Sequence, residues 1–170
     1  MKTILILAMH GSPPNDFPKR ELAELFGYHA RLETAPHSMD EASQIRYAEL
    51  DRKMRNWPRT AENDPFHAAS LSLAQQLEAV SGLETRVCFN EFCAPTLEEA
   101  VKGAVEEGFQ RIAVVTPMMT RGGEHAEHEI PAQIQKLQSE FPAIRLIYAW
   151  PFEETEIARF LSAQVSRFLE

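Results

Sequence analysis

Four short, almost continuously apolar runs constrain the fold of this chain more than any other feature of its sequence. Such runs are typical of strands that are covered on both faces, as in a parallel sheet flanked by helices. Helical patterns separate the runs, and this alternation favours right-handed crossover connections. The sequence therefore predicts an α/β fold with a four-stranded parallel sheet and helices on both faces. The predicted strands are residues 3–9, 85–89, 111–116 and 144–149.

Capping residues mark the starts of the predicted helices. Asp64 followed by Pro65 is a cap with a first-turn proline, and Thr96 with Glu99 is a capping box. Pro131 fits the first turn of a third helix that ends before the next proline. A last helix, from about residue 153, carries an apolar stripe that we expect to pack on the rest of the fold. The stripe consists of Ile157, Phe160, Leu161, Val165 and Phe168.

The connection after the first strand is far longer than the few residues usual in such folds. It comprises residues 13–63, and its pattern is helical. One helix is expected over 19–32, and Ser38 with Glu41 is a capping box for a second. We interpret the chain as a single domain, residues 1–170, with an inserted helical hairpin. The apolar face expected for the second helix holds Met39, Ala42, Ile45 and Ala48.

Charge, hydropathy and cysteine usage exclude several classes. A net charge of −8 argues against a general nucleic-acid binder, which needs a basic surface. No apolar run approaches the roughly 18 residues of a membrane span, and the first run is too short for a signal-peptide core. Cys88 and Cys93 have no second pair, so they are not a zinc signature. We expect a cytoplasmic protein in which both are buried thiols.

Chemistry should gather where strands end, because ligands of open parallel sheets bind beyond the carboxyl ends of the strands. His10 follows the first strand, Glu91 follows the second, and His125 lies in the loop after the third. In a sheet of order 2-1-3-4 these three strand ends are neighbours, about 4.8 Å apart. Two imidazoles and a carboxylate suit a first-row divalent metal.

Three stretches of the sequence resemble the sirohydrochlorin chelatase family, with its small cobaltochelatase (CbiX-type) and ferrochelatase members. The first is the opening strand running into His10-Gly11-Ser12. The second is the run from Phe89 to Leu97, which is similar to the family's F-x-E-x-x-x-P-x-L. The third has the spacing P-x5-G-x-H-x3-[DE]-I-P and is the most specific. It consists of Pro117, Gly123, His125, Glu129, Ile130 and Pro131.

This resemblance implies roles for particular residues. His10 and His125 would bind the metal, with Glu91 as a further ligand or proton acceptor, and the three would be the catalytic residues. Glu129 stands where the family usually has Asp, which we expect to affect only the surroundings of the ligands. His128 is an addition that we interpret as an exposed polar residue or a spare ligand. The substrate site would include Ser12, Arg121, Gly122 and Gly123.

The resemblance also implies an activity and an assembly. As a family member, the chain would insert a divalent metal into sirohydrochlorin or a related tetrapyrrole during cobalamin or siroheme biosynthesis. The metal would be Co2+ or Fe2+, with Ni2+ as a further candidate. The metal is a substrate, and no organic cofactor is expected. The family fold is flavodoxin-like, with strand order 2-1-3-4. Longer relatives contain two such domains facing one another, so a single-copy chain implies a homodimer, without a nucleic-acid or membrane partner.

The chemistry of metal insertion suits these residues. Two neutral imidazoles leave coordination positions open for pyrrole nitrogens, unlike a closed four-ligand cage, and a nearby base can accept the pyrrole protons. Sirohydrochlorin carries many carboxylates, which basic side chains would bind. We therefore expect the insertion to form a lid or wall over the tetrapyrrole, or else to carry a solvated face with internal ion pairs. Its basic residues beyond Lys19 are Arg20, Arg31, Arg46, Arg52, Lys53, Arg55 and Arg59.

Other functions compete with this interpretation. The same residues could bind a metal or a tetrapyrrole in a non-catalytic carrier, and the insertion could adapt the pocket to a different tetrapyrrole. A phosphohydrolase with His10 as nucleophile is disfavoured, because Met9 stands where that class has a phosphate-binding arginine. The remaining histidines, His29, His37 and His67, are expected at the surface or on helices rather than at the metal.

Overall fold

The computed structural model describes residues 1–35 and 39–169, and its centre is a parallel sheet of order β2-β1-β3-β4. The strands are β1 (Thr3–Met9), β2 (Thr85–Phe89), β3 (Arg111–Val115) and β4 (Arg145–Tyr148). The predicted α/β class, strand order and parallel pairing are confirmed, and each strand lies within one residue of its predicted bounds.

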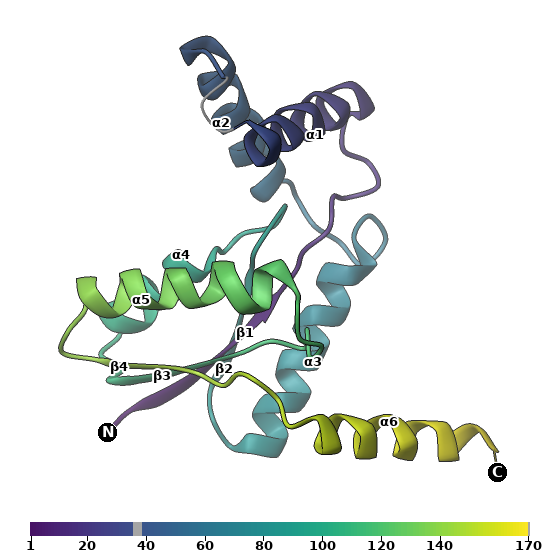
Figure 1. Cartoon of the computed structure of the whole chain (residues 1–170), viewed down its shortest axis with the longest axis vertical. Coiled ribbons are helices and arrows are strands. Elements are labelled where there is room, and N and C mark those ends of the chain that lie inside the picture. Colours follow the sequence, from purple (N-terminus) through teal and green to yellow (C-terminus); the bar gives the residue numbers. More distant parts are fainter. Residues whose placement is uncertain (36–38, 170) are drawn as a thin grey trace.

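Helices cover both faces of this sheet (Figure 1). On one face α4 (Leu97–Glu106) and α5 (Ile130–Glu140) pack on the alternate β1 residues Ile4, Ile6 and Ala8. On the other face α3 (Pro65–Ser81) packs on Leu7, Met9 and the neighbouring residues of β2. The period of two along a strand explains why successive β1 side chains enter different cores.

Local capping signals place the helices as expected. The Asp64 side chain accepts a hydrogen bond from the His67 backbone at the start of α3, and Thr96 and Glu99 make both bonds of the capping box of α4. Cys88 and Cys93 are buried free thiols, as predicted. Among the described residues, no helix is long and apolar enough to span a membrane.

The last helix, α6 (Glu154–Leu169), corrects one prediction. We expected its apolar stripe to be packed, but none of the helix's described residues is buried. Phe160 is 61% exposed and Phe168 81%. The helix runs away from the sheet, on the side of the molecule opposite α1 and α2 (Figure 1). Periodicity identifies an apolar face of a helix, but it does not say what covers that face.

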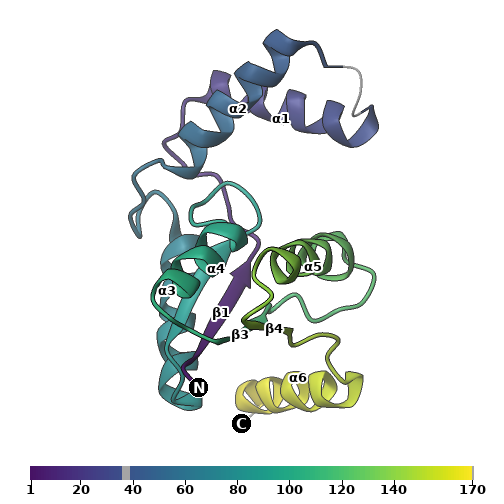
Figure 2. The ribbon, with the colours of Figure 1, turned by 90° about the vertical axis from the view of Figure 1, so that its left-hand side faces the viewer.

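The insertion forms two helices, α1 (Lys19–Thr34) and α2 (Glu41–Arg55), which stand beyond the carboxyl end of β1 (Figure 2). They enclose a small core of their own, made of Phe17, Leu25, Leu50 and Met54. Of the four residues predicted to form the apolar face of α2, Met39 is buried, but Ala42, Ile45 and Ala48 are exposed, so the prediction was wrong for these three. The helix instead buries Leu50 and Met54 in the core that it shares with α1. Asp40 caps α2, whereas Ser38 lies outside the described residues.

A buried ion pair joins the insertion to the sheet. The guanidinium of Arg59 binds the carboxylate of Asp64, and their side chains are 6% and 0% exposed. Arg59 also donates to the backbone carbonyls of Ser12, Met54 and Phe92. Asp64 in turn accepts a hydrogen bond from the Ser12 hydroxyl, at 3.0 Å. The loops that follow β1 and β2 are therefore both tied to the end of the insertion.

Asp64→Ala should lower the free energy of unfolding by about 3–5 kcal/mol, because it leaves the Arg59 guanidinium buried without its partner. Urea denaturation followed by circular dichroism measures this. Glu156→Ala, which removes the partner of exposed Arg159, is the matched control and should change stability by less than about 1 kcal/mol. Equal stability of the two variants would contradict the assigned role of the pair.

The same pair predicts a pH dependence of stability. Burial disfavours the charged form of Asp64, but the hydrogen bonds from His67, Ser12 and Arg59 outweigh it and hold its pKa below the ordinary value. Because the pKa is depressed in the folded state, this stabilisation is present at neutral pH and is lost as the pH falls through that pKa. Asp64→Asn should therefore lose less stability than wild type on acidification below about pH 5.

Candidate metal site

Three predicted residues converge beyond the carboxyl edge of the sheet. Each of His10, Glu91 and His125 offers a donor atom, and these atoms lie within 4.8 Å of one another. The distance from His125 Nε2 to Glu91 Oε1 is 3.9 Å. The rings of His10 and His125 meet edge to face, with centroids 4.7 Å apart. The three side chains follow neighbouring strands, and together they can offer two imidazoles and a carboxylate to one divalent ion.

The backbone around Gly11 explains the close approach of the loops after β1 and β2. The Glu91 N–H donates to the His10 carbonyl at 2.8 Å. Gly11 has φ +99, and a Cβ there would lie 2.0 Å from the Glu91 carbonyl oxygen. Only glycine fits this position, because it tolerates positive φ and has no side chain to collide. The glycine of the His-Gly-Ser motif thus holds His10 and Glu91 side by side.

A short π-helix (His125–Glu129) presents the second histidine. Segments of this kind occur often at functional sites, since the extra residue in the turn redirects side chains. Glu129 Oε2 lies 2.7 Å from His125 Nδ1. When Nδ1 donates its proton to this carboxylate, Nε2 is left with a free lone pair on the side of Glu91. Glu129 is therefore placed to set the tautomer and the orientation of His125.

The predicted substrate-binding residues are placed differently. The Ser12 hydroxyl donates inward to Asp64, and Arg121, whose side chain is 62% exposed, pairs with Glu127 at 3.1 Å. Gly122 and Gly123 lie exposed in the loop before the π-helix, and Gly122 has φ +84. His128 is also exposed. The structure does not test these residues' contacts with a substrate, so their role stays a prediction.

Several basic residues of the insertion are engaged within the protein. Arg46 pairs with Glu24, Lys53 with Glu21, and Arg55 with Asp51; Arg59 has its pair in Asp64. These contacts favour internal ion pairing at those positions over the binding of substrate carboxylates. Arg20, Arg31 and Arg52 are exposed. The wall over a tetrapyrrole stays a prediction.

One residue beside the metal candidates was missed by the sequence analysis. His29, on α1, has its Nε2 3.4 Å from Glu91 Oε1. No local pattern signals this contact, because the two residues are brought together only by the packing of the insertion. His67 stacks on Phe89 instead, and burial lowers its pKa. His37 lies outside the described residues.

Comparison with known proteins identifies the family. The CbiX family model matches residues 62–167, which is more than half of the chain. The chain belongs to the CbiX family. The matched region contains Glu91 and His125 and begins after α2, whereas His10 precedes it. The resemblance stated from the motifs is thereby confirmed.

Relatives of this CbiX-family chain carry the names of chelatases. It is 37% identical over 84 residues to the sirohydrochlorin ferrochelatase of Priestia megaterium. This match covers 49% of this chain and 30% of that protein. It is 40% identical over 63 residues to the sirohydrochlorin cobaltochelatase of Methanopyrus kandleri, and this match covers 36% of this chain and 43% of that protein. The matches thus span less than half of these relatives' length.

Solved structures show weaker likeness. A cobalamin biosynthesis CbiX protein of Marinobacter aquaeolei has a TM-score of 0.48 and 18% identity, and the match covers 98% of this chain and 97% of that one. The sirohydrochlorin chelatase SirB of Bacillus subtilis subspecies spizizenii, in complex with cobalt, has a TM-score of 0.44 and 20% identity. That match covers 89% of this chain and 44% of the SirB chain.

Glu129→Ala should weaken Co2+ binding by about 10–100-fold, as the loss of a carboxylate behind a histidine ligand commonly does. Isothermal titration calorimetry measures the affinity. Glu129→Gln should keep part of it, because the amide oxygen can still accept from Nδ1. Glu124→Ala, an exposed acid beside the same π-helix, is the control. If Glu129→Ala binds as tightly as this control, Glu129 does not orient His125.

Proposed function

We propose that this chain inserts a divalent metal ion, Co2+ or Fe2+, into sirohydrochlorin or a related tetrapyrrole. The observation that carries the proposal is the convergence of His10, Glu91 and His125 at the carboxyl edge of the sheet of a CbiX-family chain. The names of the relatives support this activity over that of a carrier, since they are ferrochelatases and cobaltochelatases. The buried thiols of Cys88 and Cys93 fit the cytoplasmic location that we expect.

The donor set suits a metal that has to be released into a product. Three donors hold the ion while leaving positions open for the incoming pyrrole nitrogens. His125, oriented by Glu129, would offer Nε2, and His10 would complete the imidazole pair. Glu91 lies close enough to bind the ion or to accept a pyrrole proton. An ion held at this edge would meet the face of a flat macrocycle in a fixed orientation.

Metal insertion into sirohydrochlorin, followed anaerobically by absorbance with Co2+, Fe2+ and Ni2+ in parallel, tests this activity. Wild type should exceed the spontaneous rate, and His10→Ala and His125→Ala should fall to it, because each removes a ligand. His128→Ala, which changes an exposed histidine three residues from His125, should keep its activity. Metal binding by wild type without turnover would reject the chelatase and favour a carrier.

We infer that two copies of the chain associate through α6. The exposed stripe of this helix adjoins an almost wholly apolar groove with a volume of about 440 Å³. Lining residues come from α3, from β1, from the end of β3 and the loop after it, and from α6 and the loop before it. They include Leu7, Leu73, Leu77, Val115, Met119 and Phe160. Both the stripe and the groove belong to one chain. In a dimer with two-fold symmetry, the stripe and groove of one copy would therefore pack against the same surface of the other copy.

Light scattering coupled to size-exclusion chromatography should give the mass of a dimer for wild type. Phe168→Glu should give a monomer with an unchanged circular dichroism spectrum, because Phe168 is exposed and its loss leaves the core of one copy intact. Ser166→Glu, which adds the same charge beside it on α6, is the control and should remain dimeric. A monomeric wild type at micromolar concentration would overturn the assembly.

A further inference from the structure

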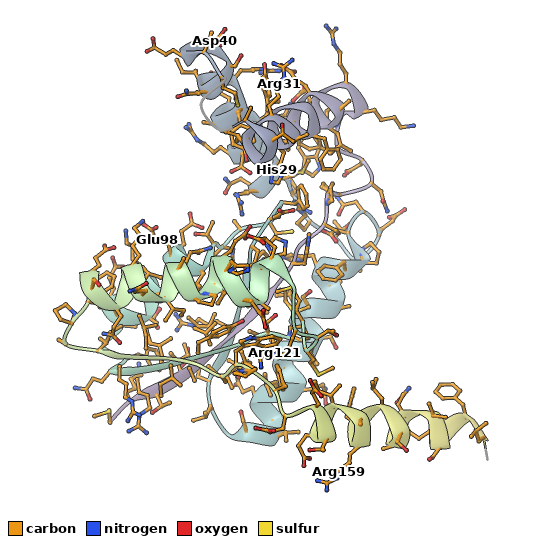
Figure 3. The ribbon with its side chains drawn as sticks, viewed as in Figure 1. His29, Arg31, Asp40, Glu98, Arg121 and Arg159 are labelled. Atoms are coloured by element: carbon orange, nitrogen blue, oxygen red, sulfur yellow. The ribbon has the colours of Figure 1, made fainter. Side chains whose placement is uncertain are left out.

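The inserted hairpin reaches the metal site through one side chain. His29 lies on α1, and its Nε2 is 3.4 Å from Oε1 of Glu91. Figure 3 shows His29 on the side of α1 that faces the sheet, whereas Arg31 lies on the far side. A cavity of about 20 Å³ beside this contact is lined by His29, Glu91, Tyr47 and Arg55, among others. That volume holds about one water molecule, so the two side chains meet in a confined space.

Other contacts fix the hairpin against the loop that carries Glu91. Arg55 donates to the carbonyls of Asn90 and Cys93, both at 3.1 Å. Phe26 meets Phe92 edge to face, with centroids 5.8 Å apart. These contacts lie on both sides of Glu91 in the sequence. The position of His29 beside the carboxylate is therefore set by several independent contacts between hairpin and loop.

The geometry separates His29 from the ligands themselves. Among the described residues, the group whose donor atoms all lie within 4.8 Å of one another comprises His10, Glu91 and His125, and it does not include His29. Oε1 of Glu91 lies within 4 Å of both imidazoles, 3.4 Å from Nε2 of His29 and 3.9 Å from Nε2 of His125. His29 is thus placed to act on a metal through Glu91.

We propose that His29 is a positioning residue of the metal site, supplied by the insertion, which orients the Glu91 carboxylate for metal binding. A glutamate side chain has considerable rotamer freedom, and a contact that restricts it lowers the entropy lost when the carboxylate binds an ion. This rests on the part of the proposed function in which the three-residue site binds a divalent ion, but not on turnover of a tetrapyrrole.

A double-mutant cycle tests the proposal, with Co2+ as the probe. Affinity by calorimetry and the visible Co2+ spectrum are recorded for wild type, His29→Ala, Glu91→Ala and the double variant. His29→Ala should weaken binding about tenfold and alter the spectrum. In the Glu91→Ala background the same change should have no further effect, because His29 acts through Glu91. His29→Gln, which keeps a hydrogen-bond donor, should restore most of the affinity.

Arg31→Ala, on the far side of the same helix, is the matched control and should bind Co2+ as wild type does. Unchanged affinity of His29→Ala would overturn the proposal, and so would an equal loss in the Glu91→Ala background. Thermal melting of each variant shows whether its fold persists. Co2+ binding is measured without tetrapyrrole, so this experiment does not depend on turnover. If wild type binds Co2+ but does not insert it, the proposed activity is rejected, while the effect of His29 on binding can still be measured.

Discussion

The buried pair of Arg59 and Asp64 is the constraint on which the rest of the site depends. A guanidinium taken out of water needs partners for its donors. The two terminal nitrogens of Arg59 find them in the Asp64 carboxylate and the backbone carbonyls of Ser12, Met54 and Phe92, whereas its buried Nε has none among the described residues. Those carbonyls belong to the loop after β1, the end of α2 and the loop after β2. Asp64 meanwhile caps α3. A single charged contact therefore fixes the segments that carry His10 and Glu91 and anchors the insertion to them.

Sheet order then decides which strand ends share an edge. Because β1 lies between β2 and β3, the carboxyl ends of these three strands are neighbours. The residues that follow them, His10, Glu91 and His125, therefore meet at the point where the strand order reverses. The sheet and its π-helix supply the two imidazoles and the carboxylate. The hairpin helices α1 and α2, which lie outside the matched residues, contribute contacts to the loop around Glu91. The metal site thus combines Glu91 and His125 of the region that the family model matches with His10 and the hairpin contacts, which lie outside it.

Much of the fold and of the site could be predicted from the sequence, because the relevant signals are local. Apolar runs marked the four strands to within a residue, and Asp64-Pro65 and the pair Thr96 and Glu99 marked two helix starts. Because ligands of parallel sheets bind at the carboxyl ends of strands, the sequence also predicted that His10, Glu91 and His125 lie together. Failures occurred where an apolar face needed a partner. The stripe of α6 was expected to be buried and is exposed, and α2 buries Leu50 and Met54 in place of Ala42, Ile45 and Ala48.

By itself the sequence determined the strands, the caps of α3 and α4 and the residue types at the metal site. Each of these follows from interactions that extend over a few residues, or from a pattern of period two or 3.6. Only the tertiary structure decided that Ser12 turns toward Asp64, that His29 meets Glu91 from 62 positions away in the chain, and that α6 leaves the sheet. Such contacts depend on how whole elements pack, and the free energy that selects one packing is shared among many side chains rather than encoded at any one of them.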